Sequence, residues 1–239
     1  MQIRGILPET TIDWPGKFAI EVFLGGCNFQ CPYCHVPDLV KSNGNGKTYS
    51  FDSFYKLLDA ERRRGWKDGV VISGGEPTIH KELPEFIDEI KKRGFPVKIY
   101  TNGSNPDMLE KIIDKLDAVS MDAKGTLEIY NLYVGTDVDS ERIRRSSEII
   151  RENLKDYEFR TTCIPVFTND TIIRMMAAWL EGSKKLVLQN FRPGTCLDPR
   201  YNDHSQFTKE GMDVLKRTAD RYFNKVEVLY NLDDDSGSD

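Results

Sequence analysis

Long apolar runs are missing from this sequence. No stretch of the 239 residues approaches the roughly 20 consecutive apolar residues that a helix needs to cross a bilayer, so we expect no membrane association. The first residues, MQIRGILPETTIDWPGK, hold no charged segment followed by an apolar one, so we expect no secretory signal and a cytoplasmic protein. A basic excess is missing too, because 33 Lys and Arg stand against 38 Asp and Glu. The net charge of −5 argues against general nucleic-acid binding, whose footprint is basic.

Cysteine is scarce as well, with five residues in a chain that is 39% apolar and long enough to bury a sizeable core. A chain of this length needs no disulfides for stability, and five is an odd number. Without an export signal, the thiols are expected to stay reduced and to serve in metal binding or catalysis. Three of them, Cys27, Cys31 and Cys34, fall within eight positions in the segment GGCNFQCPYC.

Strand-like runs alternate with amphipathic helical segments from Phe18 onward. The expected strands lie at 18–24, 68–77, 96–103, 117–125, 157–166, 184–191 and 225–230. The expected helices lie at 50–65, 80–94, 105–116, 139–154, 169–181 and 208–223. Two boundaries are marked clearly: Gly65 is a usual helix stop, and Asn105 followed by Pro106 is a strong helix start.

Strict alternation of strands and helices indicates an α/β fold with a mostly parallel sheet. Six or seven such units favour a partial (β/α)6 TIM-type barrel over a complete eight-fold one. We expect one domain over residues 1–230, followed by a disordered acidic tail over 231–239. Polar or glycine-rich segments fall at the strand ends, where parallel α/β folds build active sites: GGCNFQCPYC, SGGEP, TNG, MDAK, FRTT and LQNF.

The three clustered cysteines can hold a metal but leave one of four coordination positions unfilled. Thiolates select soft metals, namely zinc, copper or iron–sulfur clusters. A structural zinc site needs a fourth Cys or His, yet His35 directly follows Cys34 and is poorly placed to bind the same ion. Cys163, in an expected strand, and Cys196, in a distant loop, stand singly. In a [4Fe–4S] cluster, three thiolates leave one iron open to a substrate or cofactor.

Together with SGGEP (73–77), the C-x3-C-x2-C loop resembles the radical S-adenosylmethionine (SAM) enzymes. The resemblance implies that Cys27, Cys31 and Cys34 hold a [4Fe–4S] cluster and that the amino and carboxylate groups of SAM chelate the fourth iron. It also implies the reaction, in which the reduced cluster cleaves SAM to methionine and a 5′-deoxyadenosyl radical. That radical abstracts a hydrogen atom from a substrate.

The same resemblance implies a SAM pocket at the strand ends. Gly74 and Gly75 would let the backbone approach the ligand, and Glu76 would bind the methionine ammonium. Lys124 would neutralise the methionine carboxylate. The other residues expected in this pocket are Tyr33 beside adenine, Ser73, Asn102 and Asp122, and, toward ribose or adenine, Arg160 and Gln189. Three of these have simpler interpretations: GGEP as a plain turn, Lys124 as a solvated loop charge, and Arg160 as a structural arginine.

The resemblance is strongest to the glycyl-radical-enzyme activating proteins. More narrowly, TTIDWPGKFAIEVFLGGCNFQCPYC, YEFRTTCIP and LVLQNFRPGTCLDP are similar to anaerobic ribonucleoside-triphosphate reductase activating proteins. This implies a protein substrate, the Cα–H of one glycine in a partner glycyl radical enzyme, and an electron donor of the flavodoxin or ferredoxin type. One departure is Val36, because that group often carries CHNP where this chain has His35, Val36 and Pro37.

Two alternatives remain open. A small-molecule radical SAM enzyme similar to 7-carboxy-7-deazaguanine synthase would share the N-terminal motifs but would need a nucleobase-like pocket. A non-catalytic metal-binding or redox module could use the three cysteines with a ligand from a partner. Glu76 and the polar strand ends argue against the second alternative.

Overall fold

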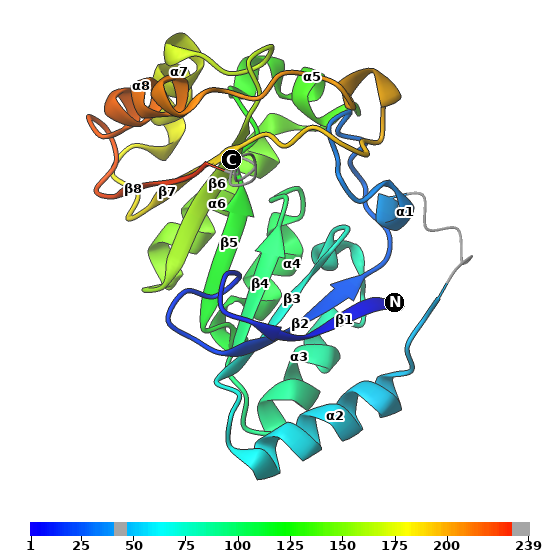
Figure 1. Ribbon diagram of the computed structural model, residues 1–239. Coiled ribbons are helices and arrows are strands. Elements are labelled where there is room, and N and C mark those ends of the chain that lie inside the picture. Colours follow the sequence, from blue (N-terminus) through cyan, green and yellow to red (C-terminus); the bar gives the residue numbers. More distant parts are fainter. Residues whose placement is uncertain (41–46, 231–239) are drawn as a thin grey trace, which may run out of the picture.

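Seven parallel strands and one antiparallel strand form a curved sheet in the computed structural model of the protein, which describes residues 1–40 and 47–230. The strands are arranged in chain order from β1 to β8, and β1 runs antiparallel to β2. Helices α3, α4 and α6 lie along the outer face of the sheet (Figure 1). The expected α/β fold with a partial TIM-type barrel is confirmed.

The predicted strands and helices occur in the predicted order, and β1, α1 and α5 are additional to them. The strands are β1 Ile3–Thr10, β2 Ala19–Leu24, β3 Gly69–Gly74, β4 Val97–Thr101, β5 Ala118–Asp122, β6 Tyr157–Cys163, β7 Leu186–Asn190 and β8 Val226–Leu229. The helices are α1 Pro37–Val40, α2 Phe51–Arg64, α3 Leu83–Lys92, α4 Pro106–Ile112, α5 Tyr130–Val134, α6 Ser140–Asn153, α7 Asp170–Leu180 and α8 Lys209–Ala219. Short 3-10 turns lie at Pro77–Ile79, Ile113–Lys115, Leu127–Ile129 and Pro199–Tyr201.

Local signals account for most boundaries. Helix α2 ends at Gly65, which adopts a left-handed conformation, and α4 begins after Asn105, whose side chain accepts a hydrogen bond from the Met108 N–H. Strand β6 stops at Cys163, shorter than expected, because Pro165 cannot continue the ladder. Strand β1 was not expected. It is an edge strand with two register shifts, and Pro8 interrupts its pattern.

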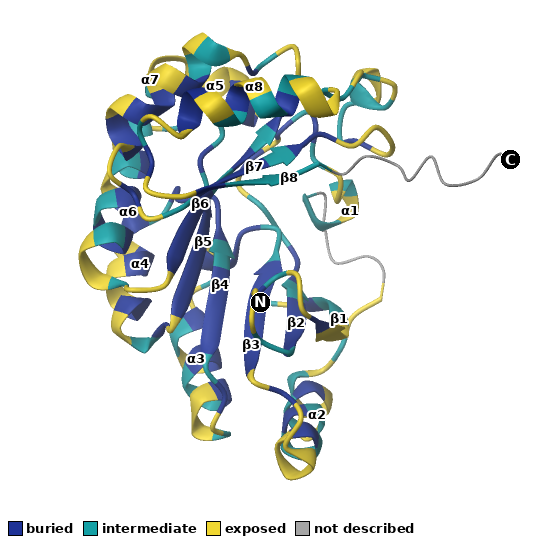
Figure 2. Cartoon of the chain, turned by 60° about the vertical axis from the view of Figure 1, so that its left-hand side comes forward, coloured by how far each residue is buried: buried dark blue, intermediate teal, exposed yellow. Residues whose placement is uncertain are grey.

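The two faces of the sheet differ sharply. Side chains such as Ile20, Val22 and Leu24 of β2 are fully buried in the apolar core. Figure 2 shows much of the sheet in the dark blue of buried residues. Successive residues of a strand point to opposite faces. Glu21 of β2 therefore points into the barrel, together with Lys98 of β4 and Glu158 of β6. A parallel sheet usually has two apolar faces, so this polar interior sets the site apart.

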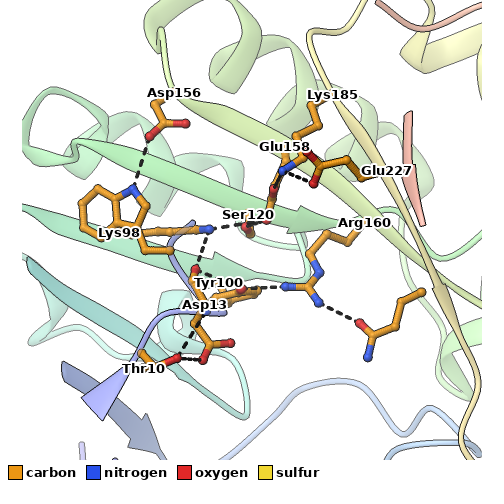
Figure 3. Close-up of polar contacts among 12 residues, drawn as sticks. Thr10, Asp13, Lys98, Tyr100, Ser120, Asp156, Glu158, Arg160, Lys185 and Glu227 are labelled. Carbon is orange, nitrogen blue, oxygen red and sulfur yellow. Dashed lines mark hydrogen bonds and ion pairs between the residues drawn. The ribbon is translucent and has the colours of Figure 1, made fainter. Parts of the chain in front are cut away.

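The β1–β2 connection closes the lower end of the barrel. Trp14 packs against Ala19, Val71 and Ala118, and its indole N–H donates to Asp156 at 3.3 Å. The Lys98 ammonium donates to the Asp13 carbonyl at 2.7 Å (Figure 3). The DWPGK segment therefore fills the lower end of the barrel, and the upper end remains open to a site.

The barrel is also open on one side. Strands β1 and β8 are the two ends of the sheet, and no pairing joins them within residues 1–40 and 47–230. No helix in the described part of the chain is long and apolar enough to span a membrane. The expected acidic tail over 231–239 lies outside the described residues, and a single domain over 1–230 stays a prediction.

Candidate active site at the upper end of the barrel

One cavity of about 400 Å³ lies at the carboxyl ends of the parallel strands and extends into the barrel. It collects nearly all of the residues expected from the sequence. The expected residues that line it are Cys27, Cys31, Tyr33, Cys34, Ser73, Gly74, Gly75, Asn102, Asp122, Lys124, Arg160 and Gln189. Glu76 is the exception.

The cysteine loop follows β2 directly and is fastened by backbone hydrogen bonds. The Gly26 N–H donates to the Leu39 carbonyl at 2.8 Å, and the Gln30 N–H donates to the Val134 carbonyl at 2.8 Å. Burial raises the pKa of the Cys27 thiol to about 12 and that of Cys31 to about 11. Without a metal the thiols are thus neutral at physiological pH. A bound cation is what would make thiolates of them.

The donor set fits an iron–sulfur cluster better than a single ion. All five cysteines are free thiols, and three of them face one cavity. Among the described residues, no group of three or more His, Cys, Asp and Glu side chains closes around one metal ion. Thiolates of a [4Fe–4S] cluster bind separate iron atoms, so they stand further apart than the ligands of one zinc.

The two glycines of SGGEP allow close contacts between backbone segments. The Gly75 N–H donates to the Leu24 carbonyl, and the Glu76 N–H donates to the Gly26 carbonyl, both at 2.8 Å. A Cβ on Gly75 would lie 1.9 Å from the Gly26 carbonyl oxygen, and Gly74 has a φ of 116°. The end of β3 is thus hydrogen-bonded to the start of the cysteine loop. Close approach between two loops is therefore one reason for a glycine at position 75, and the expected close approach to a ligand stays a prediction.

Glu76 is not among the residues that line the cavity, and its expected contact with the methionine ammonium stays a prediction. The side chain is fully buried. Its Oε1 accepts hydrogen bonds from the Thr78 N–H at 3.0 Å and the Thr101 hydroxyl at 2.8 Å, and its Oε2 accepts from the Asn102 N–H at 2.5 Å. These protein donors fix the orientation of the carboxylate. Glu76 therefore acts as a brace between the ends of β3 and β4.

Lys124 and Asp122, at the end of β5, place a cation beside the cysteines. The Lys124 Nζ lies 2.9 Å from Asp122 Oδ2 and 6.0 Å from the centre of the Tyr33 ring. Burial disfavours the ammonium, but Asp122 outweighs this and holds the pKa of Lys124 well above its usual range. A permanent cation here suits a ligand carboxylate, so the solvated-loop interpretation of Lys124 is wrong.

Tyr33 contributes to the cavity wall, but its ring packs inward. The ring is 5% exposed and lies 5.9 Å from the Phe167 ring, centre to centre. The expected contact of Tyr33 with adenine stays a prediction.

Arg160, on β6, is held between a side chain of β4 and a side chain of β7. Its guanidinium donates to the Tyr100 hydroxyl at 2.6 Å and to Gln189 Oε1 at 2.7 Å (Figure 3). Further into the barrel, the Ser73 hydroxyl donates to Glu21 Oε1 at 2.5 Å. Burial raises the pKa of Glu21 to about 7. The inner wall of the cavity therefore combines the Arg160 guanidinium with the weakly acidic carboxyl group of Glu21.

Several lining residues were not predicted. Glu21, Asp13 and Tyr100 belong to the inner wall, and Val36 forms part of the rim. The sequence does mark Glu21 as a candidate, because it is the one charged residue of the strand FAIEVFL. Its side chain points to the opposite face of the strand from those of Ile20 and Val22. No local sequence pattern marks Asp13, since only the folded DWPGK segment brings its side chain to the cavity.

The two remaining cysteines differ from each other. Cys163 is fully buried in the core, as expected. Cys196 was expected in a distant loop, but its sulfur lies 3.9 Å from His35 Nδ1. The loop after β7 covers the cysteine loop, because the Leu197 N–H donates to the Cys34 carbonyl at 2.9 Å.

The sequence signature of the radical SAM superfamily matches residues 22–178, which span the cysteine loop and strands β2 to β6. The chain belongs to the radical SAM superfamily. It is accordingly a radical SAM enzyme, and enzymes of this superfamily use a [4Fe–4S] cluster and S-adenosylmethionine. The three free thiols, the cavity and the permanent cation of Lys124 fit these two groups.

Two named relatives and one solved structure are similar to this chain. A Methanocaldococcus jannaschii protein, a glycyl-radical enzyme activating enzyme by predicted function, is 30% identical over 233 residues, 95% of each chain. The 7-carboxy-7-deazaguanine synthase of Aquifex aeolicus is 29% identical over 116 residues, 48% of this chain and 50% of that protein. The fold is similar to that of Escherichia coli coproporphyrinogen III oxidase, a radical SAM enzyme, with a TM-score of 0.58 at 14% identity over 84% of this chain and 50% of that one.

Proposed function

We propose that this protein activates a glycyl radical enzyme by removing a hydrogen atom from one of its glycines, and that the partner is an anaerobic ribonucleoside-triphosphate reductase. The observation that carries the proposal is the similarity to the M. jannaschii activating enzyme over 95% of both chains. The segments shared with reductase activating proteins, such as LVLQNFRPGTCLDP, support this choice of partner.

The cofactors would supply the chemistry. When bound, the cluster and SAM provide one-electron reductive cleavage of a C–S bond and hydrogen-atom abstraction. The chain's own task is to hold the two groups and a glycine loop in line and to keep water out. We assign Cys27, Cys31 and Cys34 to the cluster and Lys124 to the methionine carboxylate. Arg160 and Gln189 are assigned to the nucleoside.

The shape of the site supports a protein substrate. The cavity volume of about 400 Å³ is near the lower end of the roughly 300–1,000 Å³ typical of pockets for one small ligand. A cluster and SAM would occupy most of it. Within residues 1–40 and 47–230 no strand pairing joins β1 to β8, and we propose that a loop of another protein enters on this side.

The reaction requires a reductant and an anaerobic setting. We infer a flavodoxin- or ferredoxin-type electron donor and a cytoplasmic location, since reduced thiols and a low-potential donor belong together there. No general base is needed, because a hydrogen atom moves rather than a proton.

The inner wall of the cavity favours a second candidate, a small-molecule radical SAM enzyme similar to 7-carboxy-7-deazaguanine synthase. Glu21, Asp13 and Arg160 offer acceptors and donors that could read the edge of a purine-like ring. The similarity to the Aquifex enzyme covers only half of each chain.

Electron paramagnetic resonance separates the candidates. The reconstituted protein, SAM and a reductant are incubated anaerobically with the reductase encoded in the same genome. The proposal predicts a glycyl doublet on the reductase, with one 5′-deoxyadenosine formed per radical. If the doublet is absent and a purine precursor is turned over instead, the second candidate is correct.

A further inference from the structure

Asn102, expected from the sequence to bind SAM, is turned toward a cysteine instead. It follows β4 in the turn YTNGS, where its backbone N–H donates to the buried carboxylate of Glu76. Its side chain is 6% exposed. The brace by Glu76 fixes the backbone of this turn, so the amide group projects from a rigid support.

The hydrogen-bond network determines which way the Asn102 amide faces. The Ser104 backbone N–H, which can only donate, lies 2.9 Å from Asn102 Oδ1. That atom is therefore the oxygen, and the nitrogen must be on the other side. There Asn102 Nδ2 donates to Asn28 Oδ1 at 3.0 Å, and Asn28 Nδ2 in turn donates to the Ser104 hydroxyl at 2.8 Å. The ring of contacts closes on itself and locks both amides.

One N–H of Asn102 remains, and it faces the first cysteine. Asn102 Nδ2 lies 4.0 Å from Cys27 Sγ, and the backbone N–H of Phe29 approaches the same sulfur at 3.4 Å. With Asn28 accepting one N–H and Cys27 the other, both donors of the Asn102 amide are used within the protein.

We propose that Asn102 is a positioning residue that tunes the cluster, raising its reduction potential through a hydrogen bond to the sulfur of Cys27. Hydrogen bonds to cluster sulfurs are a general control on that potential, because they favour the more negative, reduced state. The inference rests on family membership and on Cys27 as a ligand. It does not depend on which substrate the enzyme uses.

The test is a redox titration of the anaerobically reconstituted holoprotein without SAM, followed by the electron paramagnetic resonance signal of the reduced cluster. Asn102→Leu removes the donor, and Asn102→Asp replaces it with a negative oxygen while keeping the acceptor for Ser104. At the potential where half of the native clusters are reduced, loss of one hydrogen bond should lower the ratio of reduced to oxidised cluster roughly two- to tenfold in Asn102→Leu. Asn102→Asp should lower it further.

Asn105→Asp is the matched control. It adds a charge three positions away in the same turn and keeps a good helix cap. The ratio should stay at the native value. Clusters loaded to native iron content in both Asn102 variants with an unchanged midpoint would overturn the proposal.

Asn28→Ala covers the case in which the Asn102 variants take up no iron. It removes the acceptor that holds the Asn102 amide and leaves Asn102 in place. A smaller shift in the same direction is expected. A native midpoint at native iron content in Asn28→Ala would then overturn the proposal.

Discussion

Gly75 touches Gly26 backbone to backbone, which makes the glycine motif and the cysteine loop one unit. A methyl group at Gly75 would lie 1.9 Å from the Gly26 carbonyl oxygen, and no flexible side chain can give way there. Gly75→Ala should therefore displace the cysteine loop and reduce iron loading. The measurement is iron and sulfide content after anaerobic reconstitution. Gly182→Ala, at a glycine with open space around it, is the control and should load normally. Equal loading of Gly75→Ala and native protein would contradict this interpretation.

Glu76→Ala should destabilise the protein as well as weaken SAM binding. It leaves the buried donors of Thr78, Thr101 and Asn102 without an acceptor, and each such loss costs about 1–3 kcal/mol. The check is urea unfolding beside calorimetry with SAM. Glu76→Gln retains an oxygen acceptor and should lose less stability. A stable Glu76→Ala protein with selectively lost SAM affinity would instead indicate direct contact.

Most of the site could be predicted because its residues follow strands. The carboxyl ends of parallel strands meet at one edge, so the order of strands and helices along the chain is enough to group Asn102, Lys124 and Gln189. The direction of a side chain could not be predicted in the same way. The pattern SGGEP is the same whether the Glu76 carboxylate faces a ligand or the protein. The direction of this carboxylate depends on the position of Thr101 in the folded protein.

The parts of the fold that could not be predicted depend on contacts between residues far apart in the sequence. Strand β1 is irregular, with Gly5 and Pro8 inside it, and only its pairing with β2 makes it a strand. Asp13 reaches the cavity because Trp14 fills the lower end of the barrel. Cys196 approaches His35 across 161 positions of sequence. None of these contacts leaves a local pattern.

Lys124→Met should weaken SAM binding while the cluster stays intact. Removing a buried cation opposite a carboxylate loses a charge-assisted hydrogen bond, so the affinity should fall roughly ten- to a hundredfold. Calorimetry of the reconstituted protein measures it. Lys184→Met, a charge change away from the cavity, should leave the affinity unchanged. If both variants bind SAM like the native protein, Lys124 has no part in the site.

Cys27→Ala, Cys31→Ala and Cys34→Ala should each abolish the native cluster spectrum and SAM cleavage. Cys163→Ala should lose stability only, because that thiol is fully buried among apolar side chains. Cys196→Ala should keep its iron. A cluster that is lost in Cys196→Ala and kept in Cys34→Ala would reassign the third ligand.

Stability should depend on pH through Glu21. Its pKa is raised to about 7 by burial, from 4.5, so the native state keeps a proton that the unfolded chain releases. The native state therefore loses stability as the pH rises from about 4.5 to 7. Glu21→Gln removes this loss. Its advantage over the native protein in urea unfolding should be small at pH 5 and reach about 3 kcal/mol at pH 8. An advantage that does not grow with pH would contradict the assignment.

The origin of the abstracted hydrogen tests the central claim most directly. The partner reductase is labelled with deuterium at the α-carbon of its glycines and incubated anaerobically with the reconstituted protein, SAM and a reductant. Mass spectrometry of the product should show one deuterium in each 5′-deoxyadenosine that accompanies a glycyl radical. If the 5′-deoxyadenosine carries no deuterium from the labelled glycines and acquires it from a labelled purine precursor instead, the protein is not a glycyl-radical-enzyme activating enzyme.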